Sequence, residues 1–196
     1  MSAVILSLFA LFQASLTWKD YQQRGEQKFV RNDIDGSIRD FDKAIELEPR
    51  LGPHNWQRGI ALYYAGRYKD CARQFETHKT VNPEDVENAV WHFLCVARQK
   101  DAATARKGLI NINRDDRVPM MEVYSMFQGK STPEKVLNVA AGNPNGIFYA
   151  HLYIGLYHEA LGDAKASLEH IRKAAGEFYE SHYMGDVAKI HLEHRK

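Results

Sequence analysis

The nine histidines are the side chains of this 196-residue sequence best suited to hold a metal or to transfer a proton. His151 and His158 lie seven residues apart, and His182, His191 and His194 gather near the carboxyl end. The sequence contains neither HExxH nor CxxC, the spacings that metal sites commonly use. We therefore interpret these histidines as surface residues and expect no bound metal. A His-based metal-dependent enzyme or enzyme subunit stays open as an alternative.

Other patterns that could carry catalysis are weak or missing. The sequence has no glycine-rich phosphate loop and no GxSxG motif of the hydrolases. Asp42 and Glu46 are carboxylates that could exchange protons, but Arg39 and Lys43 lie on the same helix face, three or four residues away. Such spacing is typical of exposed ion pairs. We therefore expect no enzyme and no cofactor.

The composition is that of a folded protein with a balanced charge. Hydrophobic residues make up 44% and charged residues 26%, which argues against a disordered chain or a multi-span membrane protein. Lys and Arg number 26 against 25 Asp and Glu, giving a net charge of +1. This balance lacks the basic excess that phosphate binding needs, so nucleic acid is not expected as a partner.

The two cysteines, Cys71 and Cys95, lie in apolar stretches that look helical. Their spacing alone does not indicate a disulfide framework. They could pair if the protein is exported to an oxidising compartment.

The elements that position these residues repeat along the chain. At an offset of 34 residues the following landmarks align: Gly25 with Gly59, Phe41 with Phe75, and Pro49 with Pro83. A glycine lets two helices approach closely, an aromatic residue fills their interface, and a proline ends the second helix. This period is typical of the tetratricopeptide repeat (TPR). The sequence thus predicts an all-α fold, a right-handed superhelix of antiparallel helix pairs with a C-terminal capping helix.

We expect residues 17–196 to form one helical repeat domain. Its predicted parts are repeats at 18–51 and 52–85, a degenerate pair at 86–110, a helical insertion at 111–146, a repeat at 148–181 and a cap at 182–195. In the insertion, Pro119 and Pro133 are expected in the first turns of two short helices, with Thr132 as an N-cap. The segment Asn143–Gly146 is expected to be a loop.

Residues 1–16 differ from the rest of the chain. The apolar run from Ala3 to Phe12 is too short to span a bilayer, but it suits the central region of a signal peptide cleaved after Ala14. The alternative is an N-terminal apolar helix that packs on the first repeat. The first interpretation predicts a periplasmic or secreted protein, and the second leaves a cytoplasmic location open.

Four segments also give a narrower likeness. They are RGIALYYAGRY at Arg58–Tyr68, VWHFLCVARQKD at Val90–Asp101, MEVYSMFQGKSTPEKVL at Met121–Leu137 and, later, FYAHLYIGLYHEALGD. In this order they resemble the bacterial NlpI-type lipoproteins. Those proteins are periplasmic homodimeric adaptors that bring a processing protease together with a cell-wall hydrolase. The resemblance implies a protein–protein adaptor or scaffold, and with it a possible homodimer. A self-assembling structural protein is a further alternative.

One difference from that family concerns its lipid anchor. The lipoproteins carry an acylated cysteine just after the signal, whereas no cysteine precedes Cys71 here. We therefore expect no direct lipid anchor.

The partner is expected in a concave groove lined by the first helix of each unit. The candidate contacts, counted along the repeat, are Gln22, Glu26, Phe29, Trp56, Ile60, Tyr63 and Tyr64. Large aromatic residues in a groove often dominate binding energy, although such residues are also common in cores. Gln22 and Glu26 stand where chaperone-binding relatives use Lys and Asn to hold a C-terminal carboxylate. Glu26 would repel that carboxylate, which disfavours the chaperone-binding function. We expect an extended or helical segment of another protein or peptide to bind.

Overall fold

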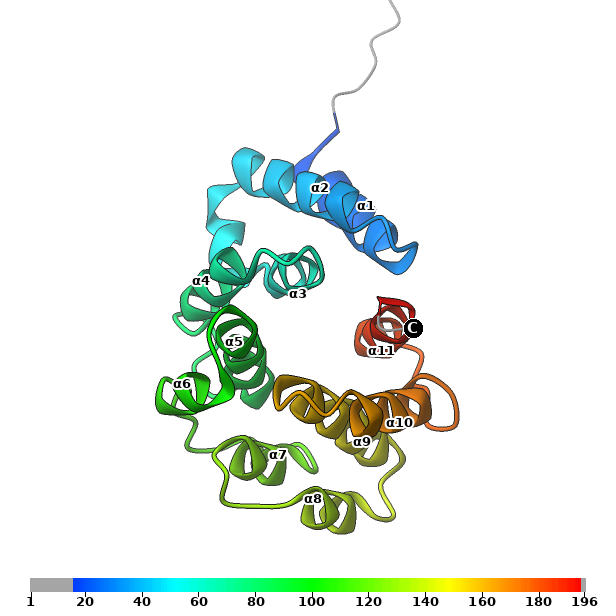
Figure 1. Cartoon of the computed structure of the whole chain (residues 1–196). Helices are drawn as coiled ribbons and strands as arrows, with labels where there is room; N and C mark the ends of the chain where they lie inside the picture. The colour runs from blue at the N-terminus through cyan, green and yellow to red at the C-terminus, as the bar shows by residue number, and fades with distance from the viewer. Residues whose placement is uncertain (1–15, 195–196) are drawn as a thin grey trace, which may run out of the picture.

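The structure, a computed structural model, describes residues 16–194. In this part of the chain the fold has eleven α-helices, one 3-10 helix and no strand (Figure 1). The helices are α1 (Trp18–Val30), α2 (Ile34–Leu47), η1 (Pro49–His54), α3 (Trp56–Tyr64), α4 (Tyr68–His78), α5 (Val86–Gln99), α6 (Ala102–Lys107), α7 (Met120–Phe127), α8 (Pro133–Ala140), α9 (Pro144–Ala160), α10 (Ala164–Ala175) and α11 (Tyr183–His194). The all-α prediction is confirmed. The expected signal peptide falls almost entirely outside the described residues.

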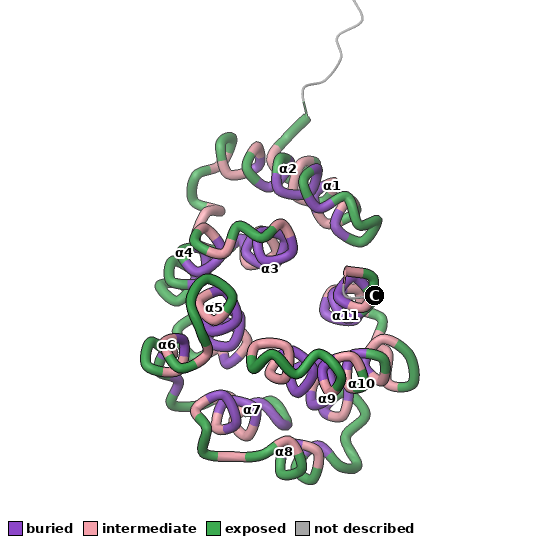
Figure 2. Tube along the Cα trace, viewed as in Figure 1, coloured by how far each residue is buried: buried purple, intermediate pink, exposed green. Residues whose placement is uncertain are grey.

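Neighbouring helices pack in pairs along a curved path. α1 contacts α2, α3 contacts α4, and α9 contacts α10. The curve brings the two ends of the described chain together, since α11 packs on α10 and also reaches α1 (Figure 1). α5 and α9 contact each other, and Figure 2 shows that both are buried along most of their length. The core therefore runs through the whole curve.

Three of the helix pairs share one packing geometry. A Cβ atom added to Gly25 would lie 2.7 Å from the ring of Phe41, and one added to Gly59 would lie 2.8 Å from the ring of Phe75. Gly155 has the same relation to Ile171, at 2.7 Å. Each contact joins residues 16 positions apart, so the aligned landmarks occupy equivalent places in their pairs. A side chain at any of these glycines would push its two helices apart.

The ends of the second helices are less regular. α2 ends at Leu47, and Pro49 then begins the 3-10 helix η1, which the sequence did not reveal. α4 ends at His78, five residues before Pro83. Pro49 thus lies just after the end of α2, as a helix-ending proline should, whereas Pro83 is too far from the end of α4 to terminate it.

The predicted insertion contains the two short helices α7 and α8. Pro133 is in the first turn of α8, and the hydroxyl of Thr132 accepts a hydrogen bond from the backbone of Lys135 at 3.4 Å. Asn143 caps α9 by accepting from the backbone of Gly146 at 2.7 Å. The segment predicted as a loop is therefore the start of a helix, because its asparagine and proline are the residues that favour a helix N-terminus.

Candidate functional site

Four of the seven predicted groove residues lie in the core. Phe29 and Ile60 are fully buried, Tyr63 is 1% exposed and Tyr64 is 9% exposed. The hydroxyl of Tyr63 donates to Glu159 at 2.5 Å, and that of Tyr64 lies 3.2 Å from Nδ1 of His191. These side chains hold the chain's own helices together and are not accessible to a partner in this structure.

The chain's last helix covers the side of the curve on which a groove was expected. Tyr183 of α11 stacks on Phe29 with 5.3 Å between the ring centroids, and its ring also meets the edge of Trp56 at 5.1 Å. At the other end of α11, His194 and Glu193 hydrogen-bond to Asn32 at 2.7 and 3.2 Å. The predicted cap is thus a helix that also closes the space between the first and last repeats (Figure 1).

The other three predicted residues, Gln22, Glu26 and Trp56, are partly exposed and line a hollow of about 280 Å³ between α1 and α3. The Glu26 carboxylate accepts from Gln22 at 2.9 Å and from Gln57 at 3.2 Å. Gln22 in turn accepts from the buried amide of Asn55 at 2.7 Å. We call these five residues the Glu26 surface. Its carboxylate and amides present hydrogen-bonding atoms at a concave edge.

A second hollow, of about 550 Å³, begins on the other side of Glu26. It lies between α1 and the residues that open α11, and it includes Arg31, Tyr183 and Asp186. Glu26 thus stands between two neighbouring hollows that could accept an extended segment. Asn55 and Gln57 were not predicted from the sequence, because they lie next to the 3-10 helix that interrupts the repeat.

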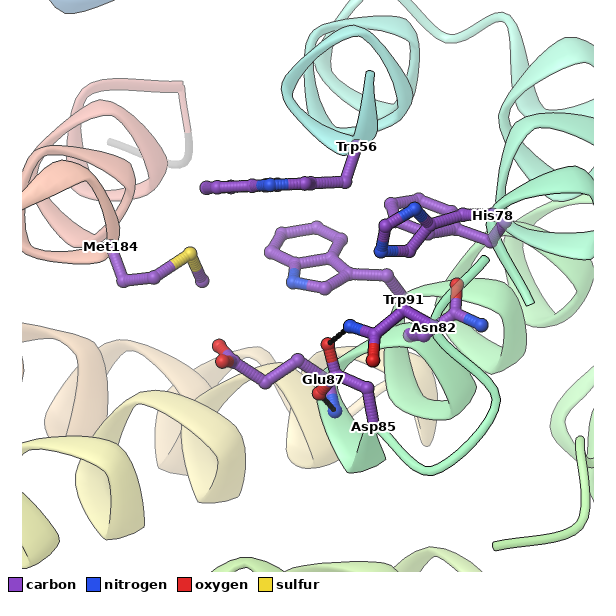
Figure 3. A pocket seen from close by; sticks show the side chains of 9 residues that line it. Trp56, His78, Asn82, Asp85, Glu87, Trp91 and Met184 are labelled. Carbon is purple, nitrogen blue, oxygen red and sulfur yellow. Dashed lines mark hydrogen bonds between the residues drawn. The ribbon is translucent and has the colours of Figure 1, made fainter. Parts of the chain in front are cut away.

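Trp56 also lines a third space, a cavity of about 130 Å³ (Figure 3). We call it the Trp56 cavity. Its walls are Trp56, Phe75, His78, Asn82, Asp85, Glu87, Asn88, Trp91 and Met184. These residues come from α3, α4, α5, α11 and the α4–α5 connection, so the cavity depends on the closure of the curve by α11.

Asp85 and Glu87, which line this cavity, belong to a cluster of ionic side chains. Arg117 pairs with Asp85 at 2.5 Å and with Glu87 and Asp115 at 2.6 Å. Glu87 also accepts a hydrogen bond from the hydroxyl of Tyr153. Burial raises the pKa of Glu87, and the charge of Arg117 opposes that rise. Burial alone would raise the pKa of Asp115, but the hydrogen bonds from Arg117 and from the backbone of Val86, together with the charge of Arg117, outweigh it and lower that pKa.

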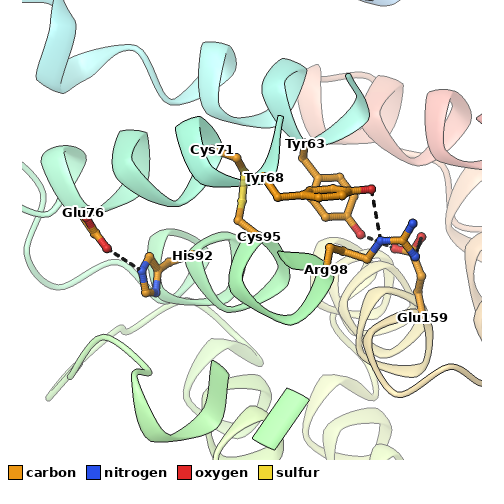
Figure 4. Close-up of a disulfide and its surroundings, with 8 residues drawn as sticks. All are labelled: Tyr63, Tyr68, Cys71, Glu76, His92, Cys95, Arg98 and Glu159. Atoms are coloured by element: carbon orange, nitrogen blue, oxygen red, sulfur yellow. Dashed lines mark hydrogen bonds and ion pairs between the residues drawn. A yellow bond between two sulfur atoms is a disulfide. The ribbon is translucent and has the colours of Figure 1, made fainter. Parts of the chain in front are cut away.

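The two cysteines form a disulfide between α4 and α5 (Figure 4). The expectation drawn from their spacing was therefore wrong, because the packing of these helices brings the Cα atoms within 5.8 Å. Near the disulfide, Arg98 donates to the hydroxyl of Tyr68 at 3.2 Å and lies 3.9 Å from Glu159. This cluster joins α3, α4, α5 and α9 in one closed region.

The histidines fall into different groups from those expected. His151 and His158 of α9 both meet His170 of α10, with 2.9 Å between the Nδ1 atoms of His151 and His170. Burial lowers the pKa of His151 to about 4. Among residues 16–194, no group of three or more His, Cys, Asp and Glu side chains is arranged to hold a metal ion.

Two further observations bear on the class of protein. Every helix within the described residues is too short or too polar to cross a membrane. No model of a known protein family matches the sequence. The features that bear on function are therefore the chain's own helix pairs, hollows and cavity.

Proposed function

We propose that this chain is a non-enzymatic TPR-type adaptor that binds a segment of another protein across the Glu26 surface. The observation that carries the proposal is the shared packing of Gly25 on Phe41 and Gly59 on Phe75. Two successive helix pairs with the same contact are what a 34-residue repeat needs to stack regularly. The superhelix of that family is part of the proposal.

The Glu26 surface favours a polypeptide as the ligand. A segment that crosses the two hollows beside Glu26 would offer backbone N–H groups to its carboxylate and amide oxygens. Trp56, partly exposed at the same edge, supplies an aromatic contact of the kind that often dominates binding energy. The carboxylate of Glu26 disfavours a partner's C-terminus, so the bound segment is internal.

Two further observations support a location outside the cytoplasm. The disulfide between Cys71 and Cys95 is of a kind that persists in oxidising compartments. The apolar residues that precede α1 have the composition of a signal peptide. Together with the resemblance to the NlpI-type adaptors, these features favour a role in a protease or cell-envelope hydrolase complex.

Site-specific photo-crosslinking tests the proposed surface. A benzophenone amino acid replaces Glu26 in one variant and Val139, a residue of α8 that is 48% exposed, in the control variant. Both are irradiated in extracts of the native source, and crosslinked proteins are identified by mass spectrometry. We expect at least one protein to crosslink at position 26 and not at position 139. The same crosslinks at both positions, or none at 26, would contradict the proposal.

A charge reversal provides a second measurement on the same surface. Glu26→Lys should abolish crosslinking from a benzophenone placed at the neighbouring Gln57, because it replaces the carboxylate proposed to accept from the partner's backbone by a side chain that only donates. Helical circular dichroism should be unchanged, since Glu26 is only partly buried. Full crosslinking in the Glu26→Lys variant would remove this carboxylate from the binding surface.

A further inference from the structure

The walls of the Trp56 cavity carry two carboxylates with accessible surface. The side chains of Asp85 and Glu87 are each 17% exposed, and both line the cavity. Figure 3 shows the Glu87 carboxylate below Met184 and the ring of Trp56. The described residues that line the cavity include neither Lys nor Arg. A group that enters the cavity therefore meets negatively charged oxygen atoms.

The local charge stays negative after the chain's own ion pairs are counted. Arg117 pairs with Asp85, Glu87 and Asp115, so three carboxylates share one guanidinium. Burial raises the pKa of Glu87, but the excess remains even with Glu87 protonated, because Asp85 and Asp115 still face a single Arg117. The cavity therefore attracts a cation and repels an anion.

The two carboxylates keep unused hydrogen-bonding capacity, since each has about four lone-pair positions. Asp85 accepts from the amide of Asn82 and from the backbone of Glu87. It also accepts from Arg117, which leaves about one position. Glu87 accepts from Arg117 and from the hydroxyl of Tyr153, which leaves about two. Together they match the three N–H groups that an ammonium donates.

The apolar walls of the cavity favour an organic cation. Trp56 is partly exposed and lines the cavity together with Met184. The face of an indole ring attracts a cation, and a thioether side chain packs well against methylene groups. A guanidinium has five N–H groups for about three acceptor positions, and a quaternary ammonium has none. A lysine fits both parts of the cavity, because it carries an ammonium on an apolar stem.

We propose that the Trp56 cavity binds an alkylammonium group, the side chain of a lysine on a bound polypeptide. A water molecule occupies about 30 Å³ of liquid, so a cavity of about 130 Å³ has room for an ammonium group and about three methylenes. Trp56 lines both this cavity and the hollow beside Glu26, so a segment bound on the Glu26 surface lies next to the cavity. The polypeptide source rests on the proposed function, but the ammonium site does not.

Small probes test the site without any partner. The indole N–H signal of Trp56 in the ¹⁵N-labelled protein is assigned with Trp56→Phe and then followed during titration. The probes are butylammonium, 1-butanol, butyrate and tetramethylammonium. We expect a saturable shift with butylammonium and binding at least about tenfold weaker for the other three, because the alcohol is uncharged, butyrate is repelled and tetramethylammonium has no N–H to donate. Equal responses to butylammonium and 1-butanol, or none to butylammonium, would overturn the proposal. Equal binding of tetramethylammonium would overturn the assignment to a primary ammonium.

A variant without one of the charges tests the carboxylates. Asp85→Asn keeps a residue that caps the start of α5, so the helical signal should be kept while butylammonium binds at least about tenfold more weakly. Asp101→Asn is the matched control, because Asp101 caps α6 and does not line the cavity. It should leave the binding unchanged. Unchanged binding in the folded Asp85→Asn variant would overturn the role of this carboxylate.

A tethered ammonium gives an independent test. Met184→Lys carries an ammonium on a stem that starts at the cavity wall, so it should occupy the site and abolish the response to butylammonium. Leu161→Lys, at an exposed position at the end of α9, adds the same charge and should leave the response unchanged. Full binding of butylammonium to a folded Met184→Lys variant would overturn the placement of the ammonium in this cavity.

The source of the ammonium group needs its own comparison. N-acetyllysine N-methylamide has one ammonium on a peptide-like frame, and its norleucine analogue has the apolar stem alone. We expect the lysine compound to shift the Trp56 signal as butylammonium does and the norleucine compound to leave it unchanged. Binding of butylammonium without the lysine compound would reject a polypeptide source while leaving the crosslinking result at Glu26 unaffected.

Discussion

The first helices of the first two repeats differ in what they expose. Residues 34 apart occupy equivalent places on α1 and α3, and the compared positions are Gln22 with Trp56, Glu26 with Ile60, and Phe29 with Tyr63. Gln22 and Trp56 are both partly exposed, and Phe29 and Tyr63 are both buried. The two helices differ at the middle position, where Glu26 is partly exposed and Ile60 is fully buried. The repeat sets equivalent backbone positions, but the neighbouring elements decide which side chains remain accessible.

The identities of the side chains fit this division. Glu26 has its carboxylate at the edge of two hollows, where water and amides can solvate it. Ile60 is fully buried, in a place where an unpaired carboxylate would be costly. The polar side chains of the proposed Glu26 surface thus lie on α1, whereas the equivalent position on α3 belongs to the core.

The largest expected effect on stability comes from truncating a buried aromatic side chain on α3. Tyr63→Ala should lower the free energy of unfolding by about 3–5 kcal/mol, because it leaves a cavity between α3 and α5 and removes the hydrogen bond to Glu159. Gln23→Ala, at an exposed position of α1, should change it by less than about 0.5 kcal/mol. Urea unfolding followed by circular dichroism measures both. Similar losses of unfolding free energy for the two variants would contradict the difference in burial between these two positions.

The second largest expected effect on the free energy of unfolding comes from removing the disulfide between α4 and α5. Replacing Cys71 and Cys95 together by alanine should cost about 3 kcal/mol, because the bond closes a loop with a sequence separation of 24 in the unfolded chain. Reductant should lower the urea midpoint of the natural protein and leave that of the double variant unchanged. Two thiols titrating freely in the native protein would contradict this prediction.

Substitutions at Gly25 and Gly59 test whether the first two helix pairs are packed in the same way. Gly25→Ala and Gly59→Ala should each cost about 1–3 kcal/mol, since the new methyl group would meet Phe41 or Phe75. Gly52→Ala is the control, because the nearest atom to its Cβ would be 3.8 Å away. Thermal unfolding should show similar losses for the two variants and almost none for the control. A loss confined to one repeat would mean that the pairs are packed differently.

Much of this fold could be predicted from the sequence because its signals are local. Glycine, aromatic and cap residues recur at fixed spacing, and Thr132 with Pro133 starts α8 as expected. The contact of α11 with α1, which closes the curve, could not be predicted from such local signals. Contacts such as Tyr183 with Phe29 and His194 with Asn32 join residues more than 150 positions apart, and no period marks them.

The candidate site was predictable in part for the same reason. Counting along the repeat identified Gln22, Glu26 and Trp56, which lie together at an open edge. The same count selected Tyr63 and Tyr64, because it gives the direction of a side chain on its own helix and not what later covers it. The pairing of Cys71 with Cys95 depends on the distance between two helices, which spacing in the sequence does not give.

The smallest expected effect is a loss of stability in acid that originates in the last repeat. His151 of α9 packs against His170 and the ring of Phe178, with Glu169 and Lys173 as the charged groups of α10 that act on it. Burial lowers its pKa to about 4, from an ordinary value of 6.5. Between these two pH values the unfolded chain binds the proton and the folded chain does not, so stability falls as the pH falls.

From pH 7.5 to pH 5 this difference should cost about 1–2 kcal/mol. His151→Leu keeps the position apolar and removes the titration, so its urea midpoint should depend less on pH than that of the natural protein. His54→Leu, at an exposed position of η1, is the control and should keep the full dependence. An acid loss that is unchanged in His151→Leu would show that it does not originate in His151.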